Sequence, residues 1–406
     1  MPNAAAETPA RCWLGFAAFY MASFGALGVF MQFFPGWLHE VAGLTESEVA
    51  VVLSAQTIAR TLLGTWWAHL VDRRGDARPI LVLLASVSVG AFALFGASQN
   101  LVTLWCVAFL FGSLYSPMYP ICDAAAMAAA ARHGFSFGRL RVAGSATYLV
   151  VIVAVGAALD RHGIAPTYGI LLVAMVAMAV SALLLPTAPM RNAAPAAVAA
   201  ARPPWTSLLR QKSLWLVLGA SALIQGSHAT FYNLSTLHWG DHGIDASTAS
   251  LVWAEGILAE IVLFWFARSA DKLRPTTLML IGGAAAIARW IVIGATTDVG
   301  LLLATGWLHA LSFGCTYLGA LRALDRRVPA PLRATAQGLL GAATSGVGMV
   351  VCGLAGGFAY DFVAGRAFFI MAGFAAAGLM CAWKLRVDMD RATASAVTAS
   401  HNDAAK

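Results

Sequence analysis

The chain has 406 residues, of which 60% are hydrophobic and 11% are charged, and its formal net charge is +7. An ordinary soluble domain has roughly 25% charged residues, so this composition excludes a soluble globular protein. Apolar stretches of about 20 residues recur along the chain, and each is long enough to cross a bilayer as a helix. We therefore predict an all-α polytopic membrane protein and, despite the positive charge, no nucleic-acid partner.

Twelve apolar segments predict twelve transmembrane helices. The expected spans are residues 12–38, 48–70, 79–97, 101–124, 138–159, 166–185, 213–239, 247–268, 275–296, 300–321, 334–360 and 364–383. The predicted domains are an N-terminal six-helix half (1–186), an Ala/Pro-rich cytoplasmic linker (187–212), a C-terminal six-helix half (213–387) and a disordered cytoplasmic tail (388–406). A weak internal repeat, in which the stretch from Gln56 aligns with that from Glu255, supports two related halves.

The positive charges orient these spans. With the N-terminus inside, 22 of the 26 Lys and Arg residues fall in inner segments and 2 fall in outer loops. This asymmetry follows the positive-inside rule, so both termini are expected in the cytoplasm.

Two opposite charges lie at predicted membrane depth. Asp123 is near the end of the fourth span and Arg141 near the start of the fifth, so a short loop allows the two side chains to meet. Charges at this depth are costly and occur mainly where they pair or line a solute pathway. The alternative is a structural ion pair that only fixes helix register.

Other polar side chains also lie within the predicted spans. The full set is Gln56, Arg60, Asp123, Arg141, Gln225, His228, Glu255, Glu260, Arg289 and His309. Its three arginines balance its three carboxylates. Gln56 and Arg60 are one helical turn apart and can face inward together. His228 and Tyr232 have the same spacing and are candidates for solute binding, although a packing role for His228 is an equal alternative.

The loop at residues 68–78, A-H-L-V-D-R-R-G-D-A-R, resembles the signature between the second and third helices of the major facilitator superfamily. Asp72, Arg73 and Gly75 match that signature, whereas Ala68 and the pair at 76–77 depart from it. The resemblance implies a twelve-helix transporter of the bacterial inner membrane and a gating-loop ion pair. The alternative for the loop is an ordinary basic inner segment.

The run F-G-R-L-R-V-A-G-S at residues 137–145 resembles the fifth helix of lactose permease and of the phenylpropionate permease group. That resemblance implies that Arg141 binds solute and pairs with Asp123. Arg289 and His309, twenty residues apart, are similar to an arginine–histidine pair of lactose permease. The phrases at 224–233 and 258–260 look more like the phenylpropionate group.

The resemblance implies an alternating-access symporter that carries a small organic solute, favoured as an aromatic carboxylate of the phenylpropionate type, inward with a proton. Lactose permease has an acid one turn after its tenth-helix histidine, whereas this chain has Ser312, which cannot carry a proton. We therefore expect Glu260 to carry it, with Glu255 and Asp123 as alternatives and with Arg289 and His309 taking part. The solute-binding candidates are Gln56, Arg60, Asp123, Arg141, Gln225, His228, Tyr232 and Arg289.

Three other functions remain open: a sugar or nucleoside symporter, a drug-efflux pump, and a non-transporting sensor or structural membrane protein. The absence of a G-x-x-x-x-G-K-[ST] loop argues against direct ATP drive, and no recognisable enzyme motif occurs. The six cysteines lie in apolar segments without a C-x-x-C, which argues against a disulfide framework or a zinc site. His238, Asp241 and His242 have no further ligands nearby in the sequence. We expect a monomer without cofactor or metal.

Overall fold

A computed structural model describes residues 8–98, 100–187, 204, 206–266, 272–329 and 332–404. Most of the predicted linker and the end of the eighth predicted span, residues 267–268, lie outside these described residues.

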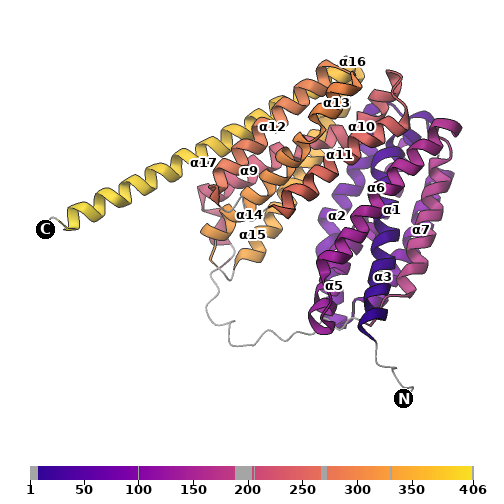
Figure 1. The fold of residues 1–406 in the computed structure, drawn as a ribbon, viewed down its shortest axis with the longest axis horizontal. Helices are drawn as coiled ribbons and strands as arrows, with labels where there is room; N and C mark the ends of the chain where they lie inside the picture. Colours follow the sequence, from indigo (N-terminus) through magenta and orange to yellow (C-terminus); the bar gives the residue numbers. More distant parts are fainter. Residues whose placement is uncertain are drawn as a thin grey trace. The chain divides into compact units, whose positions relative to one another are not determined.

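Within the described ranges the regular structure is entirely helical (Figure 1). The helices of the N-terminal part are α1 (Pro9–Glu40), α2 (Glu46–Arg74), α3 (Arg78–Ala93), η1 (Leu94–Ala97), α4 (Leu101–Tyr115), α5 (Met118–His133), α6 (Phe137–His162) and α7 (Thr167–Leu183). They continue with α8 (Thr206–Leu209), α9 (Lys212–Gly226), α10 (His228–Asp241), α11 (Ala246–Trp265), α12 (Pro275–Ala295), α13 (Val299–Gly306) and η4 (Ala310–Cys315). The last are α14 (Thr316–Arg327), α15 (Arg333–Gly341), η6 (Ala342–Gly348), α16 (Met349–Val363), η7 (Ala364–Arg366) and α17 (Ala367–Ala404).

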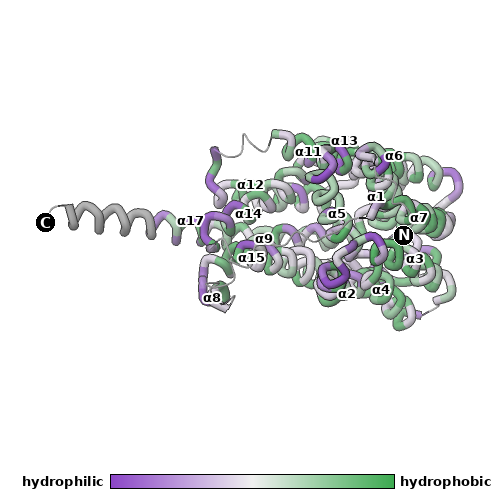
Figure 2. The backbone as a smooth tube through the Cα atoms, turned by 90° about the horizontal axis from the view of Figure 1, so that it is seen from below, coloured by the Kyte–Doolittle hydropathy of each residue, from purple (hydrophilic) through white to green (hydrophobic). Residues whose placement is uncertain are grey.

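The helices overlap the predicted spans, and some extend beyond them, as Leu101–His133 does beyond the predicted span 101–124. Nine helical segments of the described chain are long and apolar enough to cross a membrane, and one of them, Thr335–Arg391, carries two predicted spans. The sixth predicted span is the shorter helix α7, and the seventh is divided into α9 and α10. Figure 2 shows mainly hydrophobic helices, with hydrophilic residues at ends such as those of α2 and α14. Helices are expected here because lipid offers no hydrogen bonds to an open backbone.

Two local breaks position the charged residues of the first half. α4 ends at Tyr115, and α5 begins after Pro117, which has no N–H to continue the helical ladder. α5 ends at Gly134, whose φ of 74° is left-handed and suits glycine at a helix terminus. α6 begins three residues later, at Phe137, so the chain returns at once beside α5.

The described chain forms two compact units. The first contains Met1–Ala196, Tyr232–Ala254 and Gly357–Ala364, and the second contains Ala197–Phe231, Glu255–Gly356 and Gly365–Lys406. These units do not follow the predicted division at the linker. Parts of α11 and α16 belong to the first unit, in which α11 contacts α1 and α6, and α16 contacts α2.

Each unit has its own core. In the first, aromatic rings of α1 stack along one helix face, with Phe30 and Phe34 centroids 4.9 Å apart and Phe34 and Trp37 centroids 5.6 Å apart. In the second, the fully buried Trp290 donates its Nε1 hydrogen to Ser227 Oγ at 2.8 Å. Because both cores contain large, closely packed rings, they hold nearby side chains in defined positions.

The C-terminal segment differs from the prediction. α17 continues to Ala404 through residues for which the sequence predicts a disordered tail (Figure 1, yellow). Residues 388–404 contain neither glycine nor proline and are rich in alanine, the best helix former. The helix of the last span therefore extends past the apolar segment without a stop signal.

Candidate functional site

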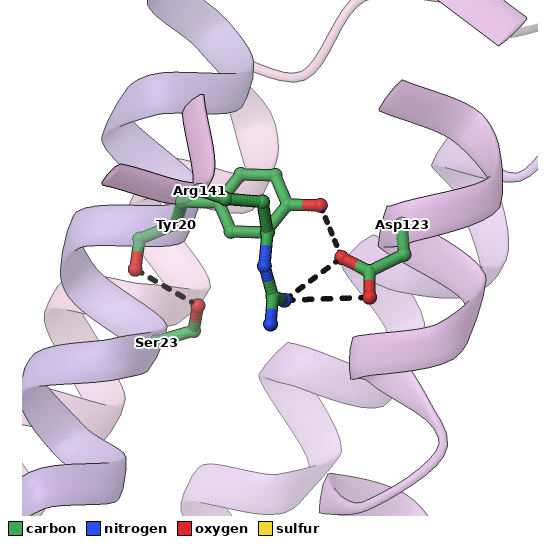
Figure 3. Close-up of polar contacts among 4 residues, drawn as sticks. All are labelled: Tyr20, Ser23, Asp123 and Arg141. Atoms are coloured by element: carbon green, nitrogen blue, oxygen red, sulfur yellow. Dashed lines mark hydrogen bonds and ion pairs between the residues drawn. The ribbon is translucent and has the colours of Figure 1, made fainter. Parts of the chain in front are cut away.

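Asp123 and Arg141 meet in the first unit, as their spacing predicts. Asp123 lies on α5 and Arg141 on α6, and Nη1 of Arg141 is 3.2 Å from Oδ1 and 3.3 Å from Oδ2 of Asp123 (Figure 3). One guanidinium nitrogen thus holds both carboxylate oxygens. The tight turn at Gly134 makes this possible because it folds α6 back beside α5.

Tyr20 of α1 completes this pair. Its hydroxyl donates a short hydrogen bond to Oδ1 of Asp123 (Figure 3). The carboxylate is therefore held by a phenol from one helix and a guanidinium from another. Sequence reasoning missed Tyr20 because it lies in an aromatic-rich first helix whose spacing does not distinguish it.

The guanidinium of Arg141 lies against aromatic rings and is still accessible. Its Cζ is 5.0 Å from the ring centroid of Phe24 and 6.0 Å from that of Tyr20. The exposed fraction is 41% for the Arg141 side chain and 31% for Asp123, which differs from a fully buried structural pair. Arg141 has five N–H donors, and in the described part of the chain only Nη1 is engaged. The remaining donors can bind a carboxylate beside an aromatic surface.

A second polar group lies in the second unit. Arg289 of α12 places Nη1 3.0 Å from Nδ1 of His309, and Nε2 of His309 is 3.7 Å from Oε2 of Glu260 on α11. Since an arginine can only donate, Nδ1 of His309 must accept, and the ring proton is on Nε2, facing the Glu260 carboxylate. The three residues form one line from guanidinium through neutral imidazole to carboxylate.

Burial falls along this line. The Arg289 residue is 2% exposed, and its Cζ lies 4.2 Å from the ring centroid of Phe231. The exposed fraction of the side chain is 9% for His309 and 24% for Glu260. His309 directly precedes the π-helical segment η4, a type of irregularity that is frequent at functional sites. Glu260 is thus the member of the line that water or a proton reaches most easily.

Glu255, the other predicted carboxylate of α11, has different neighbours from Glu260. Its Oε2 is buried without a hydrogen-bond partner among the described residues. A Cβ on Gly306 of α13 would lie 2.5 Å from that oxygen. Because glycine has no side chain, the Glu255 carboxylate fits at this position. Glu260 thus lies beside His309, whereas Glu255 packs against Gly306.

His228, Gln225 and Tyr232 have packing contacts. His228 is fully buried, with Nδ1 3.1 Å from the carbonyl of Ile224 and Nε2 2.9 Å from Ser312 Oγ, which fits the packing interpretation. Nε2 of Gln225 is 3.5 Å from the carbonyl of Phe313. The Tyr232 ring centroid is 5.8 Å from that of Trp253.

The remaining predicted residues lie on α2 and its end. Gln56 faces α4, where a Cβ on Gly112 would be 2.5 Å from its Cα, and Arg60 is exposed. Asp72 and Arg73 are exposed and form no ion pair with another described residue. Gly75, with φ of 73°, ends the helix, as its place in the motif requires.

No group of three or more His, Cys, Asp or Glu side chains that could hold a metal occurs in the described ranges. The Asp123–Arg141–Tyr20 group and the Arg289–His309–Glu260 line are two polar groups of the described chain that contain predicted site residues. Both suit binding of charges and protons and neither contains an activated nucleophile.

Known proteins are similar over most of the chain. The family model described as the MFS_1 like family matches residues 13–371. A probable 3-phenylpropionic acid transporter of Escherichia coli (strain K12) is 25% identical over 361 residues, covering 89% of this chain and 94% of the relative. A maltose permease of Geobacillus stearothermophilus is 25% identical over 355 residues, covering 84% and 86%.

Solved structures show the same fold. A mutant of the nucleoside transporter NupG matches with a TM-score of 0.80 at 14% identity, over 92% of this chain and 99% of that one. A bacterial homologue of the human lysosomal transporter Spinster matches with a TM-score of 0.67 at 12% identity, over 94% and 98%.

Proposed function

The chain belongs to the MFS_1 like family, and on that premise we propose that it carries an aromatic carboxylate of the phenylpropionate type inward together with a proton. It is a membrane transporter with a small-molecule cargo, not an enzyme. The proposed cycle is alternating access, in which the same binding groups face first one side of the membrane and then the other.

The accessible guanidinium of Arg141 is the observation that carries the proposal. It combines unused N–H donors for a carboxylate with the nearby ring of Phe24, which suits an aromatic solute. A relative with 25% identity is a probable 3-phenylpropionic acid transporter, which supports the same solute class.

Charge balance supports proton coupling. The charge of Arg141 is balanced by Asp123, with which it forms an ion pair. Arg289 contacts His309, which in turn lies beside Glu260, so this second positive charge also has a carboxylate nearby. A bound carboxylate therefore adds one uncompensated negative charge at membrane depth, which is costly. A proton on Glu260 offsets that charge, and Glu260 is the carrier we favour because His309 already accepts from Arg289 at Nδ1.

The remaining parts of the proposal concern the setting. We place the protein in the bacterial inner membrane and expect it to be a monomer. Both termini are placed in the cytoplasm, because most Lys and Arg residues fall in the predicted inner segments.

Sugar transport is the second candidate, because the maltose permease relative is also 25% identical. A sugar has no carboxylate, so it would use Asp123 and Tyr20 as hydrogen-bond partners and would leave the remaining Arg141 donors without an anion.

Uptake into proteoliposomes separates these functions. With an acidic exterior, we expect labelled 3-phenylpropionate to accumulate above its equilibrium level, while maltose and uridine do not, and a proton ionophore should abolish the accumulation. Accumulation of maltose or uridine in place of the acid would support the second candidate. Accumulation of the acid with no response to the pH gradient would contradict proton coupling.

A further inference from the structure

The tenth predicted span is interrupted beside the Arg289–His309–Glu260 line. α13 ends at Gly306, His309 follows, and the π-helical segment η4 precedes the regular helix α14. A π turn holds more residues than an α turn, and such segments are rare and are frequent at functional sites. Each residue of an α-helix turns it by about 100°, so an extra residue in η4 changes the direction in which His309 points relative to α14.

A break in the seventh predicted span lies against η4. α9 ends at Gly226, and α10 begins at His228. Nε2 of the buried His228 is 2.9 Å from Oγ of Ser312, in the middle of η4. Nδ1 of His228 is 3.1 Å from the carbonyl oxygen of Ile224, and a carbonyl can only accept. The proton of the neutral His228 ring is therefore on Nδ1, and Nε2 accepts from the Ser312 hydroxyl.

The same hydroxyl reaches the backbone of His309. Oγ of Ser312 is 3.2 Å from the carbonyl oxygen of His309, and its one hydrogen can point to either acceptor. A single buried hydroxyl thus links the start of α10 to His309. Gln225 of α9 contacts the same segment, since its Nε2 is 3.5 Å from the carbonyl oxygen of Phe313. The two residues that flank the α9–α10 break, Gln225 and His228, therefore both contact η4.

Neighbouring groups also restrict the imidazole of His309. Its ring centroid is 5.7 Å from that of Phe313, with the planes 20° apart, and 5.4 Å from that of His228. A Cβ on Gly256 of α11 would lie 3.1 Å from Cβ of His309, a close approach that the missing side chain allows. All these residues belong to the second unit. The imidazole is thus held where its two nitrogens meet the other members of the line.

We propose that His228 and Gln225 are positioning residues for proton coupling, which act through η4 and not on the solute. Their contacts keep the segment in its π form, and the π form keeps the His309 imidazole between Arg289 and Glu260. Without these contacts η4 relaxes to the commoner α form, and His309 turns away from the line. This inference rests on the proposed function, in which Glu260 carries the proton.

The tautomer of His309 tests this positioning without any solute. At about pH 8 an ordinary histidine is neutral, and the contact with Arg289 requires the ring proton to be on Nε2. We expect nitrogen-15 spectra of the histidine-labelled, full-length protein in nanodiscs to show that single tautomer. Ser312→Ala and His228→Phe should each give a mixture of both tautomers. The signals of His309 are identified by their absence in His309→Gln.

Thr344→Val is the matched control. Thr344 is buried in η6, another π-helical segment of the second unit, and its hydroxyl donates to the carbonyl of Leu340 at 2.8 Å, one turn before it. This variant loses a buried hydroxyl from a π segment that does not adjoin His309, so the single tautomer should remain. A mixture in this variant as well would show a general loss of packing and would overturn the proposal.

The remaining outcomes of the spectra also decide. A single His309 tautomer retained in both Ser312→Ala and His228→Phe would overturn the proposal, because η4 would then hold its form without the contact. If either variant does not fold, Gln225→Leu takes its place and should give the same mixture of tautomers.

Transport separates positioning from a general loss of structure. Ser312→Ala should slow proton-driven accumulation of 3-phenylpropionate about 3- to 10-fold, the effect expected for one lost hydrogen bond. Exchange of internal for external 3-phenylpropionate needs no net proton movement and should stay close to that of the unmodified protein. An equal fall in both rates would overturn the proposal. If the unmodified protein carries no 3-phenylpropionate, the proposed function fails, whereas the tautomer of His309 still decides the positioning.

Discussion

Arg141→Lys tests whether the Asp123–Arg141 pair binds solute or only orders helices. Lysine keeps the positive charge beside Asp123, so the ion pair and the fold should survive. It loses the planar fork that can hold Asp123 with one nitrogen and a solute carboxylate with another. It also loses the guanidinium that lies 5.0 Å from the Phe24 ring centroid.

The expected loss follows from these two contacts. A hydrogen bond to a charged group contributes about 1.5–3 kcal/mol, and a cation–π contact at an accessible site about 0.5–1 kcal/mol. Together they correspond to about 2–4 kcal/mol, which weakens binding of 3-phenylpropionate by about 30-fold to 1000-fold. The melting temperature without ligand should stay close to that of the unmodified protein.

Calorimetric titration of the purified protein measures this affinity, and a thermal melt without ligand reports the stability. Arg139→Lys is the matched control, because Arg139 lies on the same helix, is exposed, and forms no ion pair with another described residue. An affinity within threefold of the unmodified protein in Arg141→Lys would refute the reasoning and leave the pair with its structural role.

Glu260→Gln should abolish uphill accumulation driven by an acidic exterior and spare solute exchange, since the amide cannot carry a proton; retained accumulation would move that role to Glu255 or Asp123. Tyr20→Phe removes a donor to the Asp123 carboxylate, and titration should show about 3- to 10-fold weaker binding with normal expression. A single cysteine in His242→Cys should react with an impermeant thiol reagent added to intact cells, and one in Arg327→Cys should not. The opposite labelling pattern would invert the predicted topology.

The sequence carried enough information for the helical class, the spans and one ion pair. In lipid a backbone can satisfy its hydrogen bonds only within helices or closed barrels, so long apolar segments have few choices. The 18 positions that separate Asp123 from Arg141 cover the end of one helix, a glycine turn and the start of the next helix. This short connection brings the two side chains close together.

Contacts between helices distant in the chain were decided by the tertiary structure. The sequence places Glu255 and Glu260 on one helix but does not say which one contacts His309, whereas the structure pairs His309 with Glu260 and packs Glu255 against Gly306. The contact of Tyr20 with Asp123 was likewise not predictable from the sequence. The reason is that such contacts depend on the rotation and tilt of each helix. These are set by close packing between small residues of different helices, which local hydrophobicity and spacing do not encode.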